Sequence, residues 1–491
     1  MNFVPVSCSL ADLVGADVVA AAARARAFLT GGDLVALERL GTEPVEFYPV
    51  AWQRRLQSLL PQAGQTVVAP LVTSRDGGGT RAFQTATKKA AAPLSGLGYF
   101  RVGEDGRLYI ISKSEHYHAS LGHSFPGYEL VARARALGIP NATHNNTRGA
   151  ITRRLEEELL RAAGGTLDRV LNLETGSLAA ETAVKLALAR FYRHESTGAA
   201  PVYQGRTPVF LVVGDDDGAV SGNYHGTTIF AQTMRGLWPE LLGRGDAWRV
   251  HAVRPNSVAD LAAAFRQYES SPFKIAAFFH EIVMMNYGAR RLTKEFLQAA
   301  YRLCAEHDVP TVVDEIQSCM WYDGLFLFRQ YGLEPAMVVI GKGFPGGEYP
   351  ASRILFQSRL DGLPQFGSLV TNGQEELASL AYLVTMRWMT ANGAVVDEAG
   401  RRLEAGFRQL AAEFPDTISA VEGHGHLLGL RFPDLAHGRQ FCERMNQQGF
   451  DISVQSYKAD CPPVALTKLP CIADEALIDF TLAKMREALT Q

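Results

Sequence analysis

The sequence predicts an α/β fold in which a mostly parallel sheet is covered by helices on both faces. Apolar runs typical of buried strands recur in the middle of the chain, at 169–174, 208–215, 275–283, 309–316 and 336–342. Segments with helical spacing lie between or before them, as at 151–165 and 177–193. Apolar strands that alternate with helices are typical of a parallel sheet buried on both sides. With 491 residues the chain is also too long for one compact core, so we expect two or three packing units.

The first unit is expected at residues 1–95, as a mostly helical extension. Residues 11–29 and 45–60 have helical spacing, and Gly31 and Gly32 separate them. No catalytic constellation is visible in this stretch. The favoured interpretation is a structural extension or a subunit-contact element rather than a second enzyme.

The remaining units follow in order along the chain. Residues 96–145 contain a strand pair that turns at Glu104-Asp105-Gly106. Residues 146–375 hold the parallel sheet and form the large domain. Residues 376–491 read as a separate α+β unit, with a helix at 376–389, a strand at 425–432 and a closing helix at 475–489.

Composition narrows the class of protein. The chain carries 48 basic and 51 acidic residues, a net charge of −3, which gives no electrostatic reason to expect nucleic acid as a partner. No apolar run reaches the roughly 18 residues of a membrane span, and no secretory signal pattern opens the chain. The six cysteines form no CxxC pair, which favours free thiols in a reducing compartment. We therefore expect a cytoplasmic protein with no membrane or nucleic-acid partner.

Ligands of open α/β sheets bind beyond the carboxyl ends of the strands, so the residues that end the strands are the candidates for chemistry. After the first strand, Thr175-Gly176-Ser177 lead directly into a helix, whose free N–H groups favour a phosphate. The alternative is a plain helix cap in which Ser177 bonds its own helix, and for these residues alone the cap is favoured.

Two further strand ends carry charged residues. Asp314 ends the run at 309–316 and suits a ribose, a metal, a ring nitrogen or, with equal weight, a cap of the next turn. Lys342 ends the run at 336–342, where burial of a cation is costly, so a depressed pKa or a covalent role is plausible. Its glycine-rich surroundings do not match the P-loop pattern GxxxxGK[ST].

Together these three strand ends suit pyridoxal phosphate. The helix start holds the phosphate, the lysine forms a Schiff base, and the carboxylate keeps the ring nitrogen protonated. Lys342 follows Asp314 by 28 positions, which leaves room for one helical crossover between neighbouring strands.

At this point the sequence resembles the class III pyridoxal-phosphate aminotransferases of fold type I, from about residue 96 to the end. The matching stretches are 121–126 (LGHSFP), 174–187 (ETGSLAAETAVKLA), 223–228 (NYHGTT), 280–283 (HEIV), 313–318 (VDEIQS), 340–350 (IGKGFPGGEYP) and 366–373 (FGSLVTNG). The pair DEIQ and GKG at this separation is the specific part of the match.

The resemblance implies a role for each matched residue. Lys342 becomes the Schiff-base lysine and acid–base catalyst, Asp314 contacts the pyridine nitrogen, and Tyr224 stacks on the ring. The other cofactor-binding positions are Thr175, Gly176, Ser177, His225, Glu281, Ile316, Gln317 and Ser368. Of these, His225 is expected to hold its loop rather than act as a base, and Glu281 to lie near the substrate.

The resemblance also implies an architecture and a reaction. We expect a seven-stranded, mostly parallel sheet, with a smaller α+β domain built from N- and C-terminal segments. The expected reaction moves an amino group between an amine or amino acid and an oxo acid or aldehyde. Ser368 is expected to bind the partner subunit's phosphate, which requires a homodimer. The alternatives are a racemase, decarboxylase or other lyase on the same cofactor, and a non-enzymatic relative.

The chain departs from the family pattern in three places. Leu178 occupies a position that is usually acidic, and residues 318–324 (SCMWYDG) replace a glycine-rich segment. Thr467, with Lys468 beside it, falls where the family often has an arginine that binds the substrate carboxylate. Either Lys468 takes over this task less well, since lysine lacks the bidentate fork, or the substrate differs.

Three other groups of residues have weaker functional interpretations. His116, His118 and His123, with Glu115, could form a metal site, but HYH reads as a strand with alternate side chains on one face, so no metal is expected. Asp215, Asp216 and Asp217 read as a solvated turn. Trp321 and Tyr322 line the substrate entrance or simply pack, with equal weight.

Overall fold

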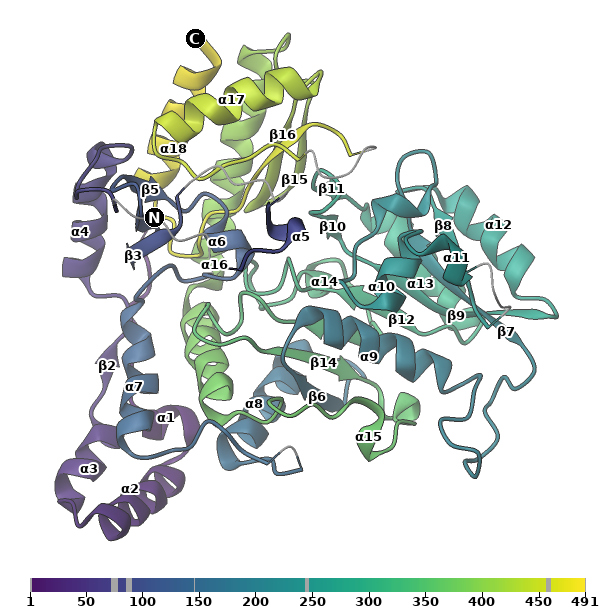
Figure 1. Cartoon of the computed structure of the whole chain (residues 1–491), viewed down its shortest axis with the longest axis horizontal. Coiled ribbons are helices and arrows are strands. Elements are labelled where there is room, and N and C mark those ends of the chain that lie inside the picture. The colour runs from purple at the N-terminus through teal and green to yellow at the C-terminus, as the bar shows by residue number, and fades with distance from the viewer. Residues whose placement is uncertain are drawn as a thin grey trace.

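A seven-stranded sheet lies at the centre of the protein, in a computed structural model that describes residues 2–71, 78–84, 91–144, 146–242, 247–455 and 461–490. The strand order is β6-β14-β13-β12-β9-β7-β8 (Figure 1). Its strands are β6 (Arg169–Leu173), β7 (Thr207–Val213), β8 (Arg249–Val253), β9 (Phe273–His280), β12 (Thr311–Asp314), β13 (Met337–Ile340) and β14 (Ser352–Phe356). Only β14 runs antiparallel to its neighbours within this sheet. The prediction of a mostly parallel sheet of seven strands is confirmed.

Both faces of this sheet are buried, as the continuous apolar strands predict. In β7, Phe210 and Val212 pack on the side of α9 (Gly176–Leu188), whereas Leu211 and Val213 pack on the opposite side. Helices α12 (Val258–Tyr268) and α13 (Lys294–Glu306) cover that opposite side and contribute to its apolar core. The side-chain period of two thus sends alternate residues into two separate cores.

The N-terminal region is partly helical and packs against the rest of the chain. Its elements are β1 (Ser7–Cys8), α1 (Leu10–Val14), α2 (Ala16–Thr30), α3 (Leu34–Thr42), β2 (Val45–Glu46), α4 (Val50–Leu59) and α5 (Arg81–Gln84). The helix expected at 11–29 is interrupted at Gly15, whose φ of 103° lies outside the helical region. The helix expected at 45–60 is wrong at its start, because Val45 and Glu46 pair with β1 and the helix begins only at Val50.

A three-stranded antiparallel sheet follows, made of β3 (Pro93–Leu97), β4 (Phe100–Gly103) and β5 (Leu108–Ile110). Its β4–β5 pair and the turn at Gly106, which has a φ of 77°, confirm the predicted hairpin. Beyond it, the strand expected around His116 and His118 is wrong. Residues Ser114–Tyr117 (α6) form a turn in which all four φ values are positive, between 46° and 76°. Such a run is costly for residues with side chains, so the surrounding structure must hold it in place.

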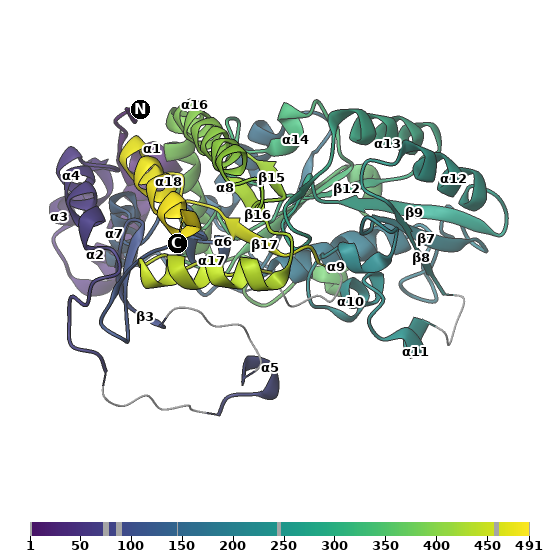
Figure 2. The same cartoon turned by 90° about the horizontal axis from the view of Figure 1, so that it is seen from above.

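The C-terminal part contains a second antiparallel sheet beside a long helix, α16 (Glu376–Glu413) (Figures 1 and 2). The sheet consists of β15 (Ala420–His424), β16 (Leu427–Arg431) and β17 (Val464–Thr467), with α17 (Leu435–Gln447) and α18 (Glu475–Thr490). The expected α+β character and closing helix are present. Helix α16 has 38 residues, however, and continues far beyond its expected end at residue 389.

The remaining elements are short and connect these units. They are α7 (Glu129–Ala136), α8 (Ala150–Ala163), α10 (Ile229–Met234), α11 (Pro239–Leu242), β10 (Val283–Met284), β11 (Arg290–Arg291), α14 (Leu327–Gln330) and α15 (Gln365–Ser368). Among the helices described, none combines the length and apolar character needed to cross a bilayer.

Candidate active site

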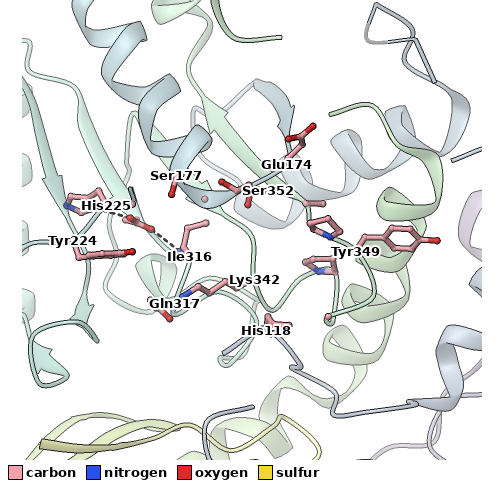
Figure 3. A pocket seen from close by; sticks show the side chains of 18 of the residues that line it. His118, Glu174, Ser177, Tyr224, His225, Ile316, Gln317, Lys342, Tyr349 and Ser352 are labelled. Atoms are coloured by element: carbon pink, nitrogen blue, oxygen red, sulfur yellow. Dashed lines mark hydrogen bonds and ion pairs between the residues drawn. The ribbon is translucent and has the colours of Figure 1, made fainter. Parts of the chain in front are cut away.

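A cavity of about 450 Å³ opens at the carboxyl ends of β6, β9, β12 and β13 (Figure 3). This volume lies in the range of small-molecule sites. Ten of the eleven site residues named from the sequence line it, and they are Thr175, Gly176, Ser177, Tyr224, His225, Glu281, Asp314, Ile316, Gln317 and Lys342. The parallel sheet therefore gathers residues that are up to 167 positions apart in the chain, from Thr175 to Lys342.

Lys342 follows β13 and lines the cavity (Figure 3). Burial lowers the pKa of its amine to about 8, against the opposing influence of the Glu281 and Asp314 carboxylates. The amine also lies 5.3 Å from the centre of the Tyr117 ring. Its backbone φ is +39°, a conformation that is strained for a lysine and is found mostly at functional sites. A buried amine with a lowered pKa is a suitable nucleophile near neutral pH.

Asp314 ends β12 and is held by two hydrogen bonds. His225 Nδ1 lies 2.9 Å from its Oδ2, and the Ile316 amide donates to its Oδ1 at 3.1 Å. The side chains of His225 and Asp314 are only 2% and 8% exposed, respectively. The carboxylate is thus fixed in direction and still lines the cavity, as a partner for a ring nitrogen requires.

The start of α9 forms a tight cradle beside this carboxylate. Thr175 is the N-cap, and its side chain makes no capping bond. The cap in which Ser177 bonds its own helix is therefore not what forms, since the Ser177 hydroxyl instead accepts from the Thr227 amide at 3.1 Å. The helix start remains available to an anion.

Two glycines permit the close packing of this cradle. A Cβ on Gly176 would lie 2.7 Å from Ile316 Cδ1. A Cβ on Gly226, whose φ is +115°, would lie 2.7 Å from the Ser177 hydroxyl oxygen. Larger residues at either position would push the cradle away from the ring-binding residues.

Tyr224 and Gln317 complete the polar and aromatic lining. The Arg235 guanidinium lies 4.9 Å from the centre of the Tyr224 ring and holds it by a cation–π contact. The Gln317 side-chain oxygen is buried and has no hydrogen-bond partner in the described chain. An unpaired buried oxygen is costly, so it indicates that the residue serves a bound group. The residues present therefore fit a phosphorylated ring with polar substituents.

Ser368, the eleventh named residue, lies outside the cavity of its own chain. It is buried in α15, and its hydroxyl accepts a hydrogen bond of 3.1 Å from Thr182 of α9. Lying outside the cavity is compatible with a role toward a partner subunit, but the burial of Ser368 within its own chain opposes it. The nearby Thr371 and Asn372 are exposed instead.

Thr467 and Lys468 do not replace a carboxylate-binding arginine. Both residues are completely buried, and neither lines the cavity. The Lys468 amine donates to the Gln317 carbonyl oxygen and lies 3.5 Å from the centre of a Trp321 ring. The described lining of the cavity also contains no arginine.

Trp321 and Tyr322 pack in the core, which decides between their two interpretations. They are 0% and 2% exposed, and neither lines the cavity. The Trp321 indole donates to the Leu469 carbonyl at 2.8 Å, and the Tyr322 hydroxyl donates to the His424 carbonyl at 2.9 Å. The bulky replacement at 318–324 therefore supports the wall from behind.

The histidines and Asp215 also take other positions than expected, whereas Asp216 and Asp217 are exposed in a turn, as predicted. His123 bonds Glu115 at 2.9 Å, whereas His118 lines the cavity, and no group among the described residues could hold a metal ion. Asp215 is buried rather than solvated, because its carboxylate accepts from the Ala219 amide at 2.7 Å and the Ser221 hydroxyl at 2.8 Å. It stabilises the turn from inside.

Nine residues that line the cavity were not named as site residues from the sequence, and Glu174, His118 and Tyr349 are among them. Glu174 and Tyr349 lie within the matched stretches 174–187 and 340–350, so treating every polar residue of these stretches as a candidate would have found them. No local signal places His118 there, because its direction depends on the left-handed turn at Ser114–Tyr117.

Comparison with known proteins gives the class of this molecule. The family model of class-III aminotransferases matches residues 86–489. The chain therefore belongs to the class-III aminotransferases, which use pyridoxal phosphate, and it is an aminotransferase dependent on that cofactor. The match favours amino transfer over the racemase, decarboxylase and lyase alternatives.

Individual relatives agree with this assignment. The chain is 27% identical to the ornithine aminotransferase of Bordetella pertussis over 381 residues, which is 76% of this chain and 86% of the relative. A transaminase from the marine bacterium Virgibacillus has a TM-score of 0.71 at 16% identity, covering 85% of this chain and 96% of its own. An ornithine aminotransferase from Toxoplasma gondii, described with partial occupancy of the cofactor at its active site, has a TM-score of 0.67 at 20% identity and covers 82% and 91%. These solved structures share the fold.

Proposed function

We propose that Lys342 carries the cofactor covalently and that Asp314, Tyr224, Gln317 and the start of α9 position it. The observation that supports this most strongly is the convergence of a lysine of lowered pKa, a fixed carboxylate and a helix start on one cavity. When bound, pyridoxal phosphate supplies an aldehyde that reacts with amines and a ring that withdraws electrons from the adjacent carbon.

The residues of the chain then divide the work. Lys342 Nζ would take the proton from the substrate carbon and deliver it to the carbon of the cofactor's former aldehyde group, which its lowered pKa favours near neutral pH. Asp314 keeps a proton on the ring nitrogen, and His225 holds this carboxylate in direction. Tyr224 and Ile316 cover the two faces of the ring. The α9 start, with Gly176 and Ser177, binds the phosphate.

The donor is proposed to be a small primary amine or amino acid, with an oxo acid or aldehyde as acceptor. Ornithine, named for the relatives, is the first donor to test. The described lining offers no arginine for a substrate carboxylate, whereas His118 and Glu281 are among the polar residues that line the cavity with Lys342. A panel that compares ornithine with the diamine that lacks its carboxylate therefore shows how much the carboxylate contributes to binding.

Hydride reduction of the purified protein, followed by peptide mapping, tests the covalent assignment. The label is expected on Lys342, and a label on another lysine would overturn it. In a separate sample of unreduced protein, addition of a donor amine is expected to convert the cofactor to its amine form with one equivalent of oxo product. Lys342→Ala is expected to slow amino transfer by about 10² to 10⁴-fold.

The protein is further proposed to act as a homodimer whose interface includes α15. Phe366 on this helix is 83% exposed, an unusual position for a large apolar side chain. Because Ser368 is buried in its own chain, the exposed Thr371 is the better placed hydroxyl for a partner's phosphate. Thr371→Val is expected to weaken cofactor binding more than Ser368→Ala. The reverse order would restore the assignment to Ser368, and a monomer that binds the cofactor tightly would contradict the shared site.

A cytoplasmic location is proposed from the cysteines. All six are free thiols, and five of them are buried. Free thiols are typical of a reducing compartment. Fractionation of the producing cells with an antibody to the chain tests this, and recovery outside the cytoplasm would contradict it.

A further inference from the structure

Lys468 is an unusual residue for the interior of a protein. Its side chain is completely buried, and no carboxylate of the described chain forms an ion pair with its amine. Burial lowers the pKa of this amine well below its usual range, and the nearby Lys342 acts in the same direction. Burial of a lysine without an acidic partner is costly, so its other contacts must offset this cost.

The contacts of Lys468 join two parts of the molecule. Its backbone amide donates to the Ser112 carbonyl at 2.8 Å, and the Ser114 hydroxyl donates to its carbonyl. Both partners belong to the segment that enters the left-handed turn at Ser114–Tyr117. Its amine, at the other end of the side chain, donates to the carbonyl oxygen of Gln317, three residues after the end of β12.

The amine also lies among the aromatic rings behind the cavity. It is 3.5 Å from the centre of the Trp321 ring and 5.2 Å from that of Tyr117. The Lys342 amine lies 5.3 Å from the same Tyr117 ring. Trp321 in turn packs so closely on the residue after Lys342 that a Cβ on Gly343 would lie 2.3 Å from the indole. Lys468 therefore lies behind the wall that carries both Gln317 and Lys342.

We propose that Lys468 is a positioning residue that holds Gln317 in the direction required to contact the cofactor. The amine donates to the Gln317 carbonyl from behind, while Gln317 itself lines the cavity. In this proposal Lys468 lies beside the position of the family's substrate-binding arginine but acts on Gln317 and does not contact the substrate. This inference rests on the proposed function, because it assigns a partner for Gln317 within that cofactor site.

Lys468→Met tests the proposal, since methionine keeps the unbranched apolar chain and removes the donor. Lys113→Met is the matched control. Lys113 belongs to the same segment, but its amine donates to the Ser453 hydroxyl at 2.6 Å, away from the cavity. Both variants are compared with the wild type for pyridoxal phosphate affinity of the apoprotein and for melting temperature with and without saturating cofactor.

The expected result separates positioning from general stability. Lys468→Met should weaken cofactor binding roughly tenfold, because a buried carbonyl loses its only side-chain donor, and should reduce the rise in melting temperature that the cofactor produces. Lys113→Met should lower both melting temperatures equally and change affinity less than about twofold. If Lys468→Met also lowers both equally with affinity unchanged, the positioning role is overturned.

A double-mutant cycle tests the route through Gln317. In a Gln317→Ala background, Lys468→Met should change cofactor affinity by less than about twofold, since the side chain that it positions is gone. Full additivity of the two losses would contradict the proposal. A raised KM for the oxo acid with unchanged cofactor affinity would instead show Lys468 as a carboxylate ligand and overturn it. If the wild type binds no cofactor at all, the proposed function fails, which is a different outcome.

Discussion

Replacement of His225 by phenylalanine isolates the hydrogen bond that fixes Asp314. The imidazole is almost fully buried, and its ring centre lies 5.5 Å from that of Phe279. Phenylalanine keeps this ring contact and most of the volume while removing Nδ1. The carboxylate then retains only the Ile316 amide as a donor.

The size of the effect follows from the geometry. A buried hydrogen bond of 2.9 Å to a charged carboxylate contributes about 1.5–3 kcal/mol. If this free energy acts on the cofactor-binding form of Asp314, cofactor affinity should fall about 10- to 150-fold. The assay is titration of the apoprotein with pyridoxal phosphate, followed by absorbance. His225→Gln, which can still donate to the carboxylate, is expected to recover part of the loss.

The reasoning is refuted by one clear pattern. In an Asp314→Ala background the His225→Phe change should cost little, because its partner is missing. If His225→Phe leaves affinity unchanged, or costs the same with and without Asp314, the histidine does not act through this carboxylate.

Three other predictions concern the cradle, the lysine and the N-terminal region. Gly226→Ala is expected to weaken pyridoxal phosphate binding more than tenfold but pyridoxal binding much less, because the new Cβ would meet Ser177 in the phosphate cradle. The control is Gly205→Ala, because the φ of Gly205 is also positive (+82°) but the space around it is open. Equal losses of affinity in both variants would contradict the cradle. The rate at which the apoprotein captures the cofactor should rise about tenfold per pH unit below pH 8 and level off above it, because only the neutral Lys342 amine reacts and its pKa is about 8. Stopped-flow absorbance measures this rate, and a rate that does not change between pH 6 and 8 would contradict the prediction. Asn392→Leu should lower the free energy of unfolding, measured by urea titration, by about 1–3 kcal/mol. The Val4 amide, which donates to the Asn392 side chain at 2.7 Å in the wild type, would lose its acceptor. A loss below about 0.5 kcal/mol would show that this contact is dispensable.

The central sheet and most of the site could be predicted because they depend on local patterns. The strands β7, β9, β12 and β13 are mostly apolar runs, and because they are parallel the residues that follow them lie at a common edge of the sheet. The strands β8 and β14, which carry charged residues, were not predicted individually. The directions of Asp314 and Lys342 follow from this rule. The sequence therefore sufficed to place ten of the eleven named residues at the cavity, while their roles stay predictions.

The errors arise where distant contacts override the local pattern. Asn392-Gly393 usually indicates a turn, yet α16 continues through it because the Asn392 side chain bonds Val4 and Gly393 packs against Asp323. The left-handed turn at Ser114–Tyr117 is likewise held by its surroundings, including the Ser114 bond to Lys468. Neither partner is visible within a short window of sequence.

The exposure of Ser368 and Lys468 was unpredictable for a related reason. A polar residue in a matched motif reads as a ligand-binding residue, but burial decides whether it can reach the ligand. Thr182 lies 186 positions from Ser368, and Gln317 lies 151 positions from Lys468. Only the folded chain shows that these internal partners already occupy both side chains.

Strand β14, which runs antiparallel to its neighbours in the central sheet, determines the distance between the helix start and Lys342. It lies between β6 and β13, which run in the same direction, so the helix start after Leu173 and the lysine after Ile340 are two strand spacings apart. Two spacings amount to about 10 Å. The spacing of the backbone therefore fixes how far the reactive carbon of a ligand must lie from its anionic group. A molecule in which these two groups are much closer together or farther apart could not contact the helix start and Lys342 at the same time.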